Sequence, residues 1–379
     1  MFFALFAAFG VHLPYFPLWL EAKGFGASEI AVILAGPMFL RVLTTPLITT
    51  LADRARNRAD VLLAMALLTF VLSLAYFGVG SFVAILVFSL LLAVPWTPLP
   101  PLADSLALSG VRRFGSNYAR MRIWGSGSFL LANFAGGLLI ATYGAETVPA
   151  LVSGTLLLAA IAALALPRLG RPSTTPPEGR APLARPALWS RYFVLAALGA
   201  GVVNGSHGFL YGFASIYWKA IGLDEGLFGL LWGTAVASEI LMFMVFTRFF
   251  GRMATPMILG IAGLCSVVRW IAYPLVEPLG LGLAGFLAVQ ALHALSTGLI
   301  LLGVQKLIAE EIGEERTGTA QGVAYFANGM AMALVTLASG PLYAALGANG
   351  FFVMAAVAAV GAVLVGLGAL SAPKGRVRR

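Results

Sequence analysis

The chain has 379 residues, of which 60% are hydrophobic and only 10% are charged. A soluble domain has about 45–50% apolar and about 25% charged residues, so this composition excludes a water-soluble fold and indicates that lipid is the solvent. The formal net charge of +9 would suggest a nucleic-acid partner in a soluble protein. The positions of the basic residues therefore decide what the charge means.

Twelve stretches are long and apolar enough to cross a bilayer, which takes about 20 predominantly apolar residues. They cover residues 2–20, 30–50, 61–79, 82–104, 123–143, 148–167, 192–218, 227–250, 255–275, 280–303, 317–339 and 350–370. Only helices satisfy their own backbone hydrogen bonds in hydrocarbon at this length. The predicted fold class is an all-α integral membrane protein with twelve transmembrane helices. Prolines interrupt the fourth stretch ahead of Asp104, so we expect that helix to be kinked or broken.

The longest polar segment lies between the sixth and seventh stretches and contains a Pro/Ser/Thr run at 171–177. Such a composition is typical of a flexible linker. It divides the spans into six plus six, the arrangement of two pseudo-symmetric halves. The predicted domains are an N-terminal six-helix bundle at 1–167, a cytoplasmic linker at 168–191, a C-terminal six-helix bundle at 192–370 and a basic cytoplasmic tail at 371–379.

Basic residues follow the predicted topology. With the N-terminus in the cytoplasm, inside segments hold 20 of the 24 Lys and Arg residues, and outside loops hold only Lys23 and Lys219. Cytoplasmic loops of membrane proteins carry such an excess. The charge thus indicates a multi-pass protein of the cell inner membrane with both termini cytoplasmic, and no nucleic-acid partner is expected.

Ionisable side chains inside spans are the most informative positions, because each costs about 2.5–3.5 kcal/mol on insertion scales and tends to mark a pathway. Glu239 lies in the eighth span, Arg269 in the ninth and His293 in the tenth, where Gln290 and Thr297 share its face. Burial raises the pKa of a carboxylate and a neighbouring arginine lowers it again. A change in the separation of Glu239 and Arg269 would then bind or release a proton. The alternative is a static ion pair that fixes helix packing.

Polar and aromatic residues at helical spacing indicate a substrate cavity. The predicted cavity residues are Arg41, Asn204, His207, Tyr211, Gln290, Gln321, Tyr325 and Asn328. A guanidinium at Arg41 would fork onto an anionic substrate, or pair with an acid in the bundle. For His207 and for the face of the eleventh span, the alternative is interhelical hydrogen bonding without a ligand.

The loop between the second and third spans resembles the signature loop of the major facilitator superfamily, Gly-x-Leu-Ala-Asp-Arg-x-Gly-Arg-Lys/Arg. Leu51, Ala52, Asp53, Arg54 and Arg58 match, whereas Thr49 and Arg56 replace the glycines and Asn57 replaces a basic residue. In that family the loop helps to latch the cytoplasmic side in the outward-facing state. The alternative is a merely basic inside loop.

Asp104 and Arg122 would complete this predicted cytoplasmic gate as an inner pair, or else be solvated charges at helix ends.

Residues 118–126, 211–218 and 267–270 look like the phenylpropionate permease group of that superfamily, which is distantly similar to sugar and nucleoside proton symporters. This resemblance implies proton-driven import of a small organic molecule such as an aromatic carboxylate. An acid, an arginine and a histidine on spans eight, nine and ten also resemble the charge relay of the lactose permease. The family's further acid, one turn after the histidine, is Ser296 here, so Glu239 would have to carry the proton.

The predicted function is a secondary active transporter that works by alternating access, with a small-molecule substrate, protons and the lipid bilayer as partners, and a monomer is expected. None of the lysines at 23, 219, 306 and 374 lies in a phosphate-binding loop, so direct ATP drive is unsupported. Histidines 12, 207 and 293 lack metal-ligand spacing, and no metal or cofactor is expected.

A proton-driven drug or metabolite exporter is the main alternative to import. An intramembrane enzyme is an alternative from another class. The sequence lacks a His-Glu-x-x-His motif, so no enzymatic activity is expected. A membrane sensor or assembly factor would have no evident need for Glu239 and Arg269 in hydrocarbon.

Overall fold

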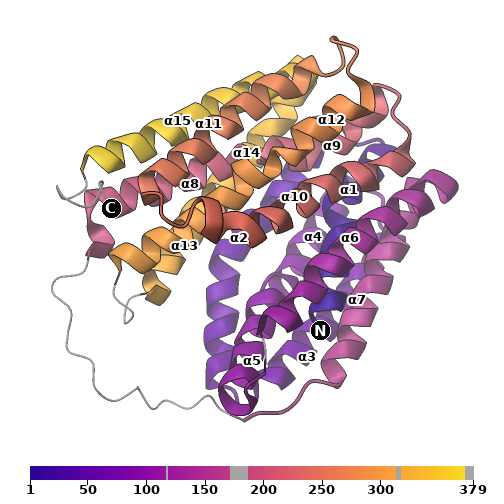
Figure 1. Cartoon of the computed structure of the whole chain (residues 1–379). Coiled ribbons are helices and arrows are strands. Elements are labelled where there is room, and N and C mark those ends of the chain that lie inside the picture. Colours follow the sequence, from indigo (N-terminus) through magenta and orange to yellow (C-terminus); the bar gives the residue numbers. More distant parts are fainter. Residues whose placement is uncertain (117, 171–186, 313–316, 372–379) are drawn as a thin grey trace. The chain divides into compact units, whose positions relative to one another are not determined.

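The computed structural model describes residues 1–116, 118–170, 187–312 and 317–371, and the elements in these ranges are helices (Figure 1). The all-α prediction is confirmed. The predicted linker and tail lie largely outside the described residues. The main helices are α1 (Phe2–Ala22), α2 (Ala27–Arg54), α3 (Arg58–Ser73), α4 (Phe82–Trp96), α5 (Leu99–Phe114), α6 (Tyr118–Tyr143), α7 (Val148–Leu164), α8 (Arg191–Gly205), α9 (Gly208–Ala220), α10 (Phe228–Phe249), α11 (Thr255–Ala272), α12 (Gly282–Ala291), α13 (Leu299–Glu311), α14 (Thr317–Leu346) and α15 (Gly350–Leu370).

Within the described residues, eleven helical runs are long and apolar enough to cross a membrane. The last of them, Ala320–Leu370, is 51 residues long and takes in most of α14 and all of α15. A 3₁₀ turn at Gly347–Asn349 separates these two helices. The chain is therefore a multi-pass membrane protein, and the count of twelve spans stays a prediction.

The fourth predicted span is broken, as expected from its prolines. α4 ends at Trp96 and α5 begins at Leu99. Pro98 between them has no N–H to continue the backbone ladder. Thr97 closes the end of α4 by donating its hydroxyl to the carbonyl oxygen of Ala93 at 2.9 Å.

Two further breaks were not predicted from the sequence. The predicted seventh span consists of α8, which ends at Gly205, and α9, which begins at Gly208. The predicted tenth span consists of α12 and α13 with a π-helical turn, η6 (Ala294–Gly298), ahead of α13. The N–H of Leu299 closes this turn on the carbonyl of Ala294, five residues earlier. Such π turns are rare and frequently mark functional sites.

The contacts divide the chain into two units. Unit 1 comprises Met1–Pro176 and Gly212–Gly233, and unit 2 comprises Pro177–Tyr211 and Thr234–Arg379. α9 and α10 thus each contribute residues to both units. Within unit 1, Gly229 of α10 lies so close to α6 that a Cβ there would lie 2.6 Å from the carbonyl oxygen of Asn133. The domain boundaries expected from the sequence, 1–167 and 192–370, stay a prediction.

Unit 1 is centred on α1, which packs along α6 and α7. The hydroxyl of Tyr15 donates to the carbonyl oxygen of Asn133 on α6 at 2.6 Å. His12 stacks on Phe16 with ring centroids 4.4 Å apart, and its edge meets Trp96 at 4.8 Å. Aromatic packing therefore fixes α1 against the end of α4.

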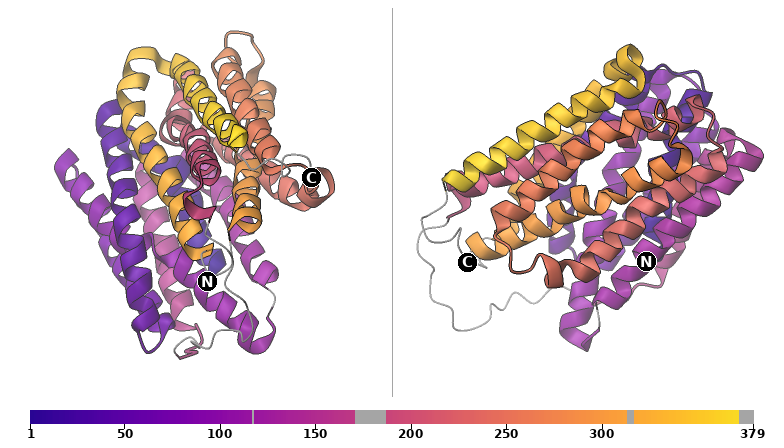
Figure 2. Two further views of the ribbon diagram at one scale, coloured as in Figure 1. Left: turned by 90° about the vertical axis from the view of Figure 1, so that its left-hand side faces the viewer. Right: turned by 45° about the horizontal axis from the view of Figure 1, so that its top comes forward.

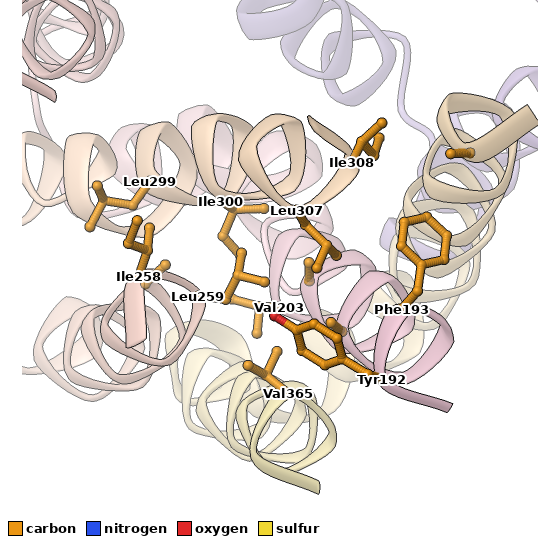
Figure 3. Close-up of a cluster of buried hydrophobic side chains, with 14 of the residues drawn as sticks. Tyr192, Phe193, Val203, Ile258, Leu259, Leu299, Ile300, Leu307, Ile308 and Val365 are labelled. Carbon is orange, nitrogen blue, oxygen red and sulfur yellow. The ribbon is translucent and has the colours of Figure 1, made fainter. Parts of the chain in front are cut away.

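In unit 2, α15 packs along α8 and α11 (Figures 1 and 2). Side chains such as Val203, Leu259, Leu307 and Val365 bring α8, α11, α13 and α15 into one buried apolar cluster (Figure 3). Helices in lipid associate through close packing of small residues, because lipid tails are as apolar as leucine. This cluster holds in place the helices that carry the candidate site.

Candidate functional site

The Arg269 side chain on α11 is fully buried in unit 2 and donates four hydrogen bonds. Its Nε donates to the carbonyl of Val289 at 3.1 Å, and Nη2 donates to Oε1 of Gln290 at 2.7 Å. Its Nη1 lies 3.0 Å from Nδ1 of His293 and 3.3 Å from Oγ of Ser296. A charge in this position is tolerated because α12 and the π turn surround it with acceptors.

These contacts fix the protonation of His293. A guanidinium can only donate, so Nδ1 of His293 must accept and the proton of the neutral ring lies on Nε2. That Nε2 faces Oε2 of Glu239 at 3.4 Å. A direct pair of Glu239 and Arg269 is expected from the sequence, whereas in the structure the two side chains contact opposite edges of the His293 ring. Their role in proton coupling stays a proposal.

The Glu239 carboxylate is the more accessible end of this chain of contacts. Its side chain is 22% exposed, compared with 7% for His293. Gly298 of the π turn packs against α10, where a Cβ added to it would lie 3.3 Å from Cγ of Met242 and 3.5 Å from Cγ of Glu239. A second proton on His293 would set two donors against each other at Nδ1, so these contacts favour the neutral ring.

His207 lies at the break between α8 and α9 and belongs to the same network. Its Nδ1 lies 3.1 Å from the carbonyl oxygen of Asn204, which can only accept, so Nδ1 carries the proton. Its Nε2 therefore accepts, and it faces the hydroxyls of Ser296 at 3.2 Å and Thr297 at 3.0 Å. The broken seventh span thus meets the π turn of the tenth span at this ring.

A cavity of about 120 Å³ in unit 2 gathers four of the predicted cavity residues, Asn204, Gln321, Tyr325 and Asn328. Asn204 Nδ2 donates to Asn328 Oδ1 at 2.6 Å. The amides of Gln321 and Gln305 donate to each other at 2.6 and 3.3 Å. Gln305, which also lines the cavity, was not predicted. Its signal was its position two turns after Thr297 on the same helical face.

Among the described residues that line this cavity none is charged, and the remainder are Ala197, Ala200, Gly201, Thr297, Ile300, Leu301, Val304 and Ala324. The wall therefore offers amide and hydroxyl groups set in apolar surface, which is the usual chemistry of a small-molecule site.

Four predicted cavity residues do not line this cavity. His207 and Gln290 are buried in the arginine network. Tyr211 follows one turn after His207, with ring centroids 6.2 Å apart. Arg41 lies on α2 in unit 1, one turn before Thr45, whose hydroxyl bonds that of Thr97 at 3.0 Å.

The predicted gate residues lie on α2, α3, α5 and α6 in unit 1. Asp53 and Arg54 end α2 and Arg58 begins α3, but the side chain of Asp53 lies outside the described residues. Asp104 is half-buried on α5. These roles stay predictions.

Arg122 makes an unexpected contact. Its guanidinium lies 3.9 Å from the ring centroid of Phe6 and 5.8 Å from that of Phe2. Such cation–π contacts stabilise a charge where few acceptors are available. The described contacts of Arg122 are therefore with α1, and its pairing with Asp104 stays a prediction.

In the part of the chain that the structure describes, no group of three or more His, Cys, Asp or Glu residues could hold a metal ion.

Interrupted transmembrane helices around a buried ionisable network and a polar cavity are the architecture of a secondary transporter. The crystal structure of the nucleoside transporter NupG is similar in fold, with a TM-score of 0.75 at 15% identity over 98% of this chain and 96% of that chain. The model of the MFS_1 like family matches residues 1–354, so the chain belongs to this family of major facilitator transporters.

Two relatives are named for their solutes. The "Probable 3-phenylpropionic acid transporter" of Escherichia coli (strain K12) is 29% identical over 364 residues, 94% of this chain and 93% of the relative. The maltose permease of Geobacillus stearothermophilus is 32% identical over 284 residues, 73% of this chain and 70% of the relative. These relatives are transporters, and so the chain is a membrane transporter of the major facilitator type with a small-molecule substrate.

Proposed function

We propose that this transporter imports a small organic solute, such as an aromatic carboxylate, together with protons by alternating access. Glu239 is the proton site in this proposal. The observation that carries it is the chain of contacts from Glu239 through His293 to Arg269, which passes beside Thr297 in the cavity wall.

Charge balance in low dielectric gives the coupling its physical basis. Glu239 and Arg269 neutralise each other across His293 when the carboxylate is ionised. A carboxylate solute adds one uncompensated negative charge, which is costly to bury. A proton on Glu239 restores neutrality, so the carrier with both solute and proton is favoured over the carrier with the solute alone.

The relative named as a 3-phenylpropionic acid transporter supports an aromatic acid as the substrate class. A neutral sugar is the second candidate, favoured by the uncharged amide and hydroxyl lining of the cavity and by the maltose permease relative. Import rather than export is part of the proposal, and proton-driven uptake into inverted membrane vesicles would contradict it.

The test compares the Glu239→Gln variant with wild type after reconstitution into proteoliposomes. We expect the Glu239→Gln variant to exchange 3-phenylpropionate across the membrane but to lose accumulation under an inward proton gradient by at least about tenfold, because an amide cannot take up the proton. Glu277→Gln is the matched control, since this exposed carboxylate lies in the same unit between η5 (Tyr273–Leu275) and α12. Accumulation by Glu239→Gln equal to that of the control would refute proton coupling at this residue.

A further inference from the structure

Among the described residues, Thr297 is the one whose side chain both lines the cavity and lies within hydrogen-bond distance of the buried network. Its side chain lines the cavity beside Asn204 and Asn328. Its hydroxyl also lies 3.0 Å from Nε2 of His207 and 3.4 Å from Nδ1 of His293. It belongs to the π turn, so the helix irregularity places it there.

The Thr297 hydroxyl competes with two other donors for the acceptor nitrogens of His207 and His293. His207 Nε2 and His293 Nδ1 each offer one lone pair, because the protons of these rings lie on the other nitrogens. Three donors face these two lone pairs: the hydroxyls of Ser296 and Thr297 and the guanidinium of Arg269.

The competition favours the other two donors. Arg269 holds His293 Nδ1 at 3.0 Å, against 3.4 Å for Thr297. At His207 Nε2 the Thr297 hydroxyl is the nearer, at 3.0 Å against 3.2 Å for Ser296. Ser296 is fully buried, however, and its only other acceptor in the described structure is the carbonyl of His293 at 3.5 Å, so Ser296 has the greater need of His207. A buried donor without a partner costs about 1–3 kcal/mol. The half-buried Thr297 can instead direct its proton into the cavity.

We propose that the Thr297 hydroxyl is a substrate contact, donating to an acceptor oxygen of the solute and above all to a carboxylate. This inference rests on the proposed function and deepens it. When a solute oxygen accepts a hydrogen bond from the Thr297 hydroxyl, Ser296 keeps its hydrogen bond to His207 and Arg269 keeps its hydrogen bond to His293. Each of these three donors then has an acceptor. Occupation of the cavity thereby completes the network that reaches Glu239.

The charged surroundings favour an anionic acceptor. Among the described residues, the ionisable groups nearest Thr297 are His207 and His293, and Tyr325 lines the same cavity. Arg269 and Glu239 lie one contact further on, with Tyr211 and Tyr273 beside Arg269. When Glu239 takes up its proton, the arginine is the uncompensated charge, and it attracts a carboxylate. Hydrogen bonds to charged acceptors are about twice as strong as neutral ones.

The experiment measures half-saturation of 3-phenylpropionate counterflow in proteoliposomes for wild type, Thr297→Val and Thr297→Ser. Valine keeps the shape and removes the donor, whereas serine keeps the donor. We expect Thr297→Val to raise the half-saturation concentration about tenfold or more, and Thr297→Ser by less than about threefold. Thr336→Val is the matched control, because the buried hydroxyl of Thr336 has no hydrogen-bond partner in the described structure.

A second probe separates a solute contact from a packing effect. 3-Phenylpropanol keeps the ring and chain of the acid but carries a neutral hydroxyl. The penalty of Thr297→Val, measured as loss of ligand-induced thermal stabilisation, should be at least about threefold smaller for the alcohol. Equal penalties for acid and alcohol, or a Thr297→Val variant indistinguishable from Thr336→Val, would overturn the inference.

The proposed function can fail separately. Wild type that exchanges the acid without accumulating it under a proton gradient overturns proton coupling, while the affinity series still decides the role of Thr297. Wild type that neither binds nor exchanges the acid overturns both.

Discussion

At the scale of single residues, Arg269 shows how a buried charge is accommodated by neutral acceptors. It has no carboxylate at contact distance in the described structure. A backbone carbonyl, an amide, an imidazole and a hydroxyl accept its hydrogen bonds. Because a guanidinium cannot be deprotonated in proteins, it also fixes the tautomer of His293. Arg269, at one edge of the His293 ring, therefore places the ring proton on the nitrogen that faces Glu239.

Replacement of Arg269 with Met should destabilise the protein by about 2–3 kcal/mol, since four hydrogen bonds at about 0.6 kcal/mol each are lost in the membrane. The apparent melting temperature of the detergent-solubilised protein measures this. The Arg248→Met variant, which removes an exposed arginine at the end of α10, should melt close to wild type. An Arg269→Met protein as stable as Arg248→Met would show that the network does not hold the π turn.

The residues of this network were only partly predictable. Glu239, Arg269 and His293 stand out because ionisable groups are rare in apolar runs. Thr297 shares the helical face of His293, and Ser296 replaces the further acid of the lactose permease, but their hydroxyls alone do not indicate a network, because hydroxyls in transmembrane helices often bond their own backbone. Their assignment needed the position of the His207 ring, about 90 residues away in sequence.

At the scale of helices, close backbone packing positions the site. Gly199 of α8 and Gly361 of α15 lie back to back, and a Cβ on Gly361 would lie 2.7 Å from the carbonyl oxygen of Gly199. Small residues allow such approach in membranes, where no hydrophobic force drives helices together. This contact holds α8, which carries Asn204 and ends at the break before His207.

Replacement of Gly361 with Ala should cost about 1–3 kcal/mol, the usual penalty of overpacking a tight contact. Gly366→Ala on the same helix is the control, because no atom lies within 4 Å of a Cβ there. Size-exclusion profiles after graded heating compare the two variants. Equal loss of the monodisperse peak would mean that α8 and α15 do not approach this closely in the membrane.

The helix breaks differ in how far the sequence predicts them. Prolines predict the break between α4 and α5, because a residue without a backbone N–H interrupts a helix whatever its tertiary surroundings. The break at Ser206–His207 and the π turn contain no proline. They are stabilised by contacts with other helices, such as the bond from the Trp270 indole to the Ser206 hydroxyl at 2.7 Å.

At the scale of the whole molecule, the distribution of Lys and Arg predicts that both termini and the connecting segment face the cytoplasm. Single cysteines on a Cys265→Ser background test this with a membrane-impermeant maleimide. Cysteines at Glu146 and Glu277 should react in intact cells, and those at Ser173 and Ser371 only after permeabilisation. Labelling of Ser173 and Ser371 from opposite sides would contradict the division of the spans into six plus six.

The sequence by itself determined that the chain is embedded in the membrane, is helical and resembles transporters. The length of an apolar stretch, the placement of its charges and the motif of a loop are properties of each segment alone. Only the tertiary structure decided that His293 lies between Glu239 and Arg269, that the seventh and tenth spans break where they meet, and that Thr297 joins the cavity to the network. Those features are fixed by which helix faces touch, and contacts between distant segments leave no periodic signal in either of them.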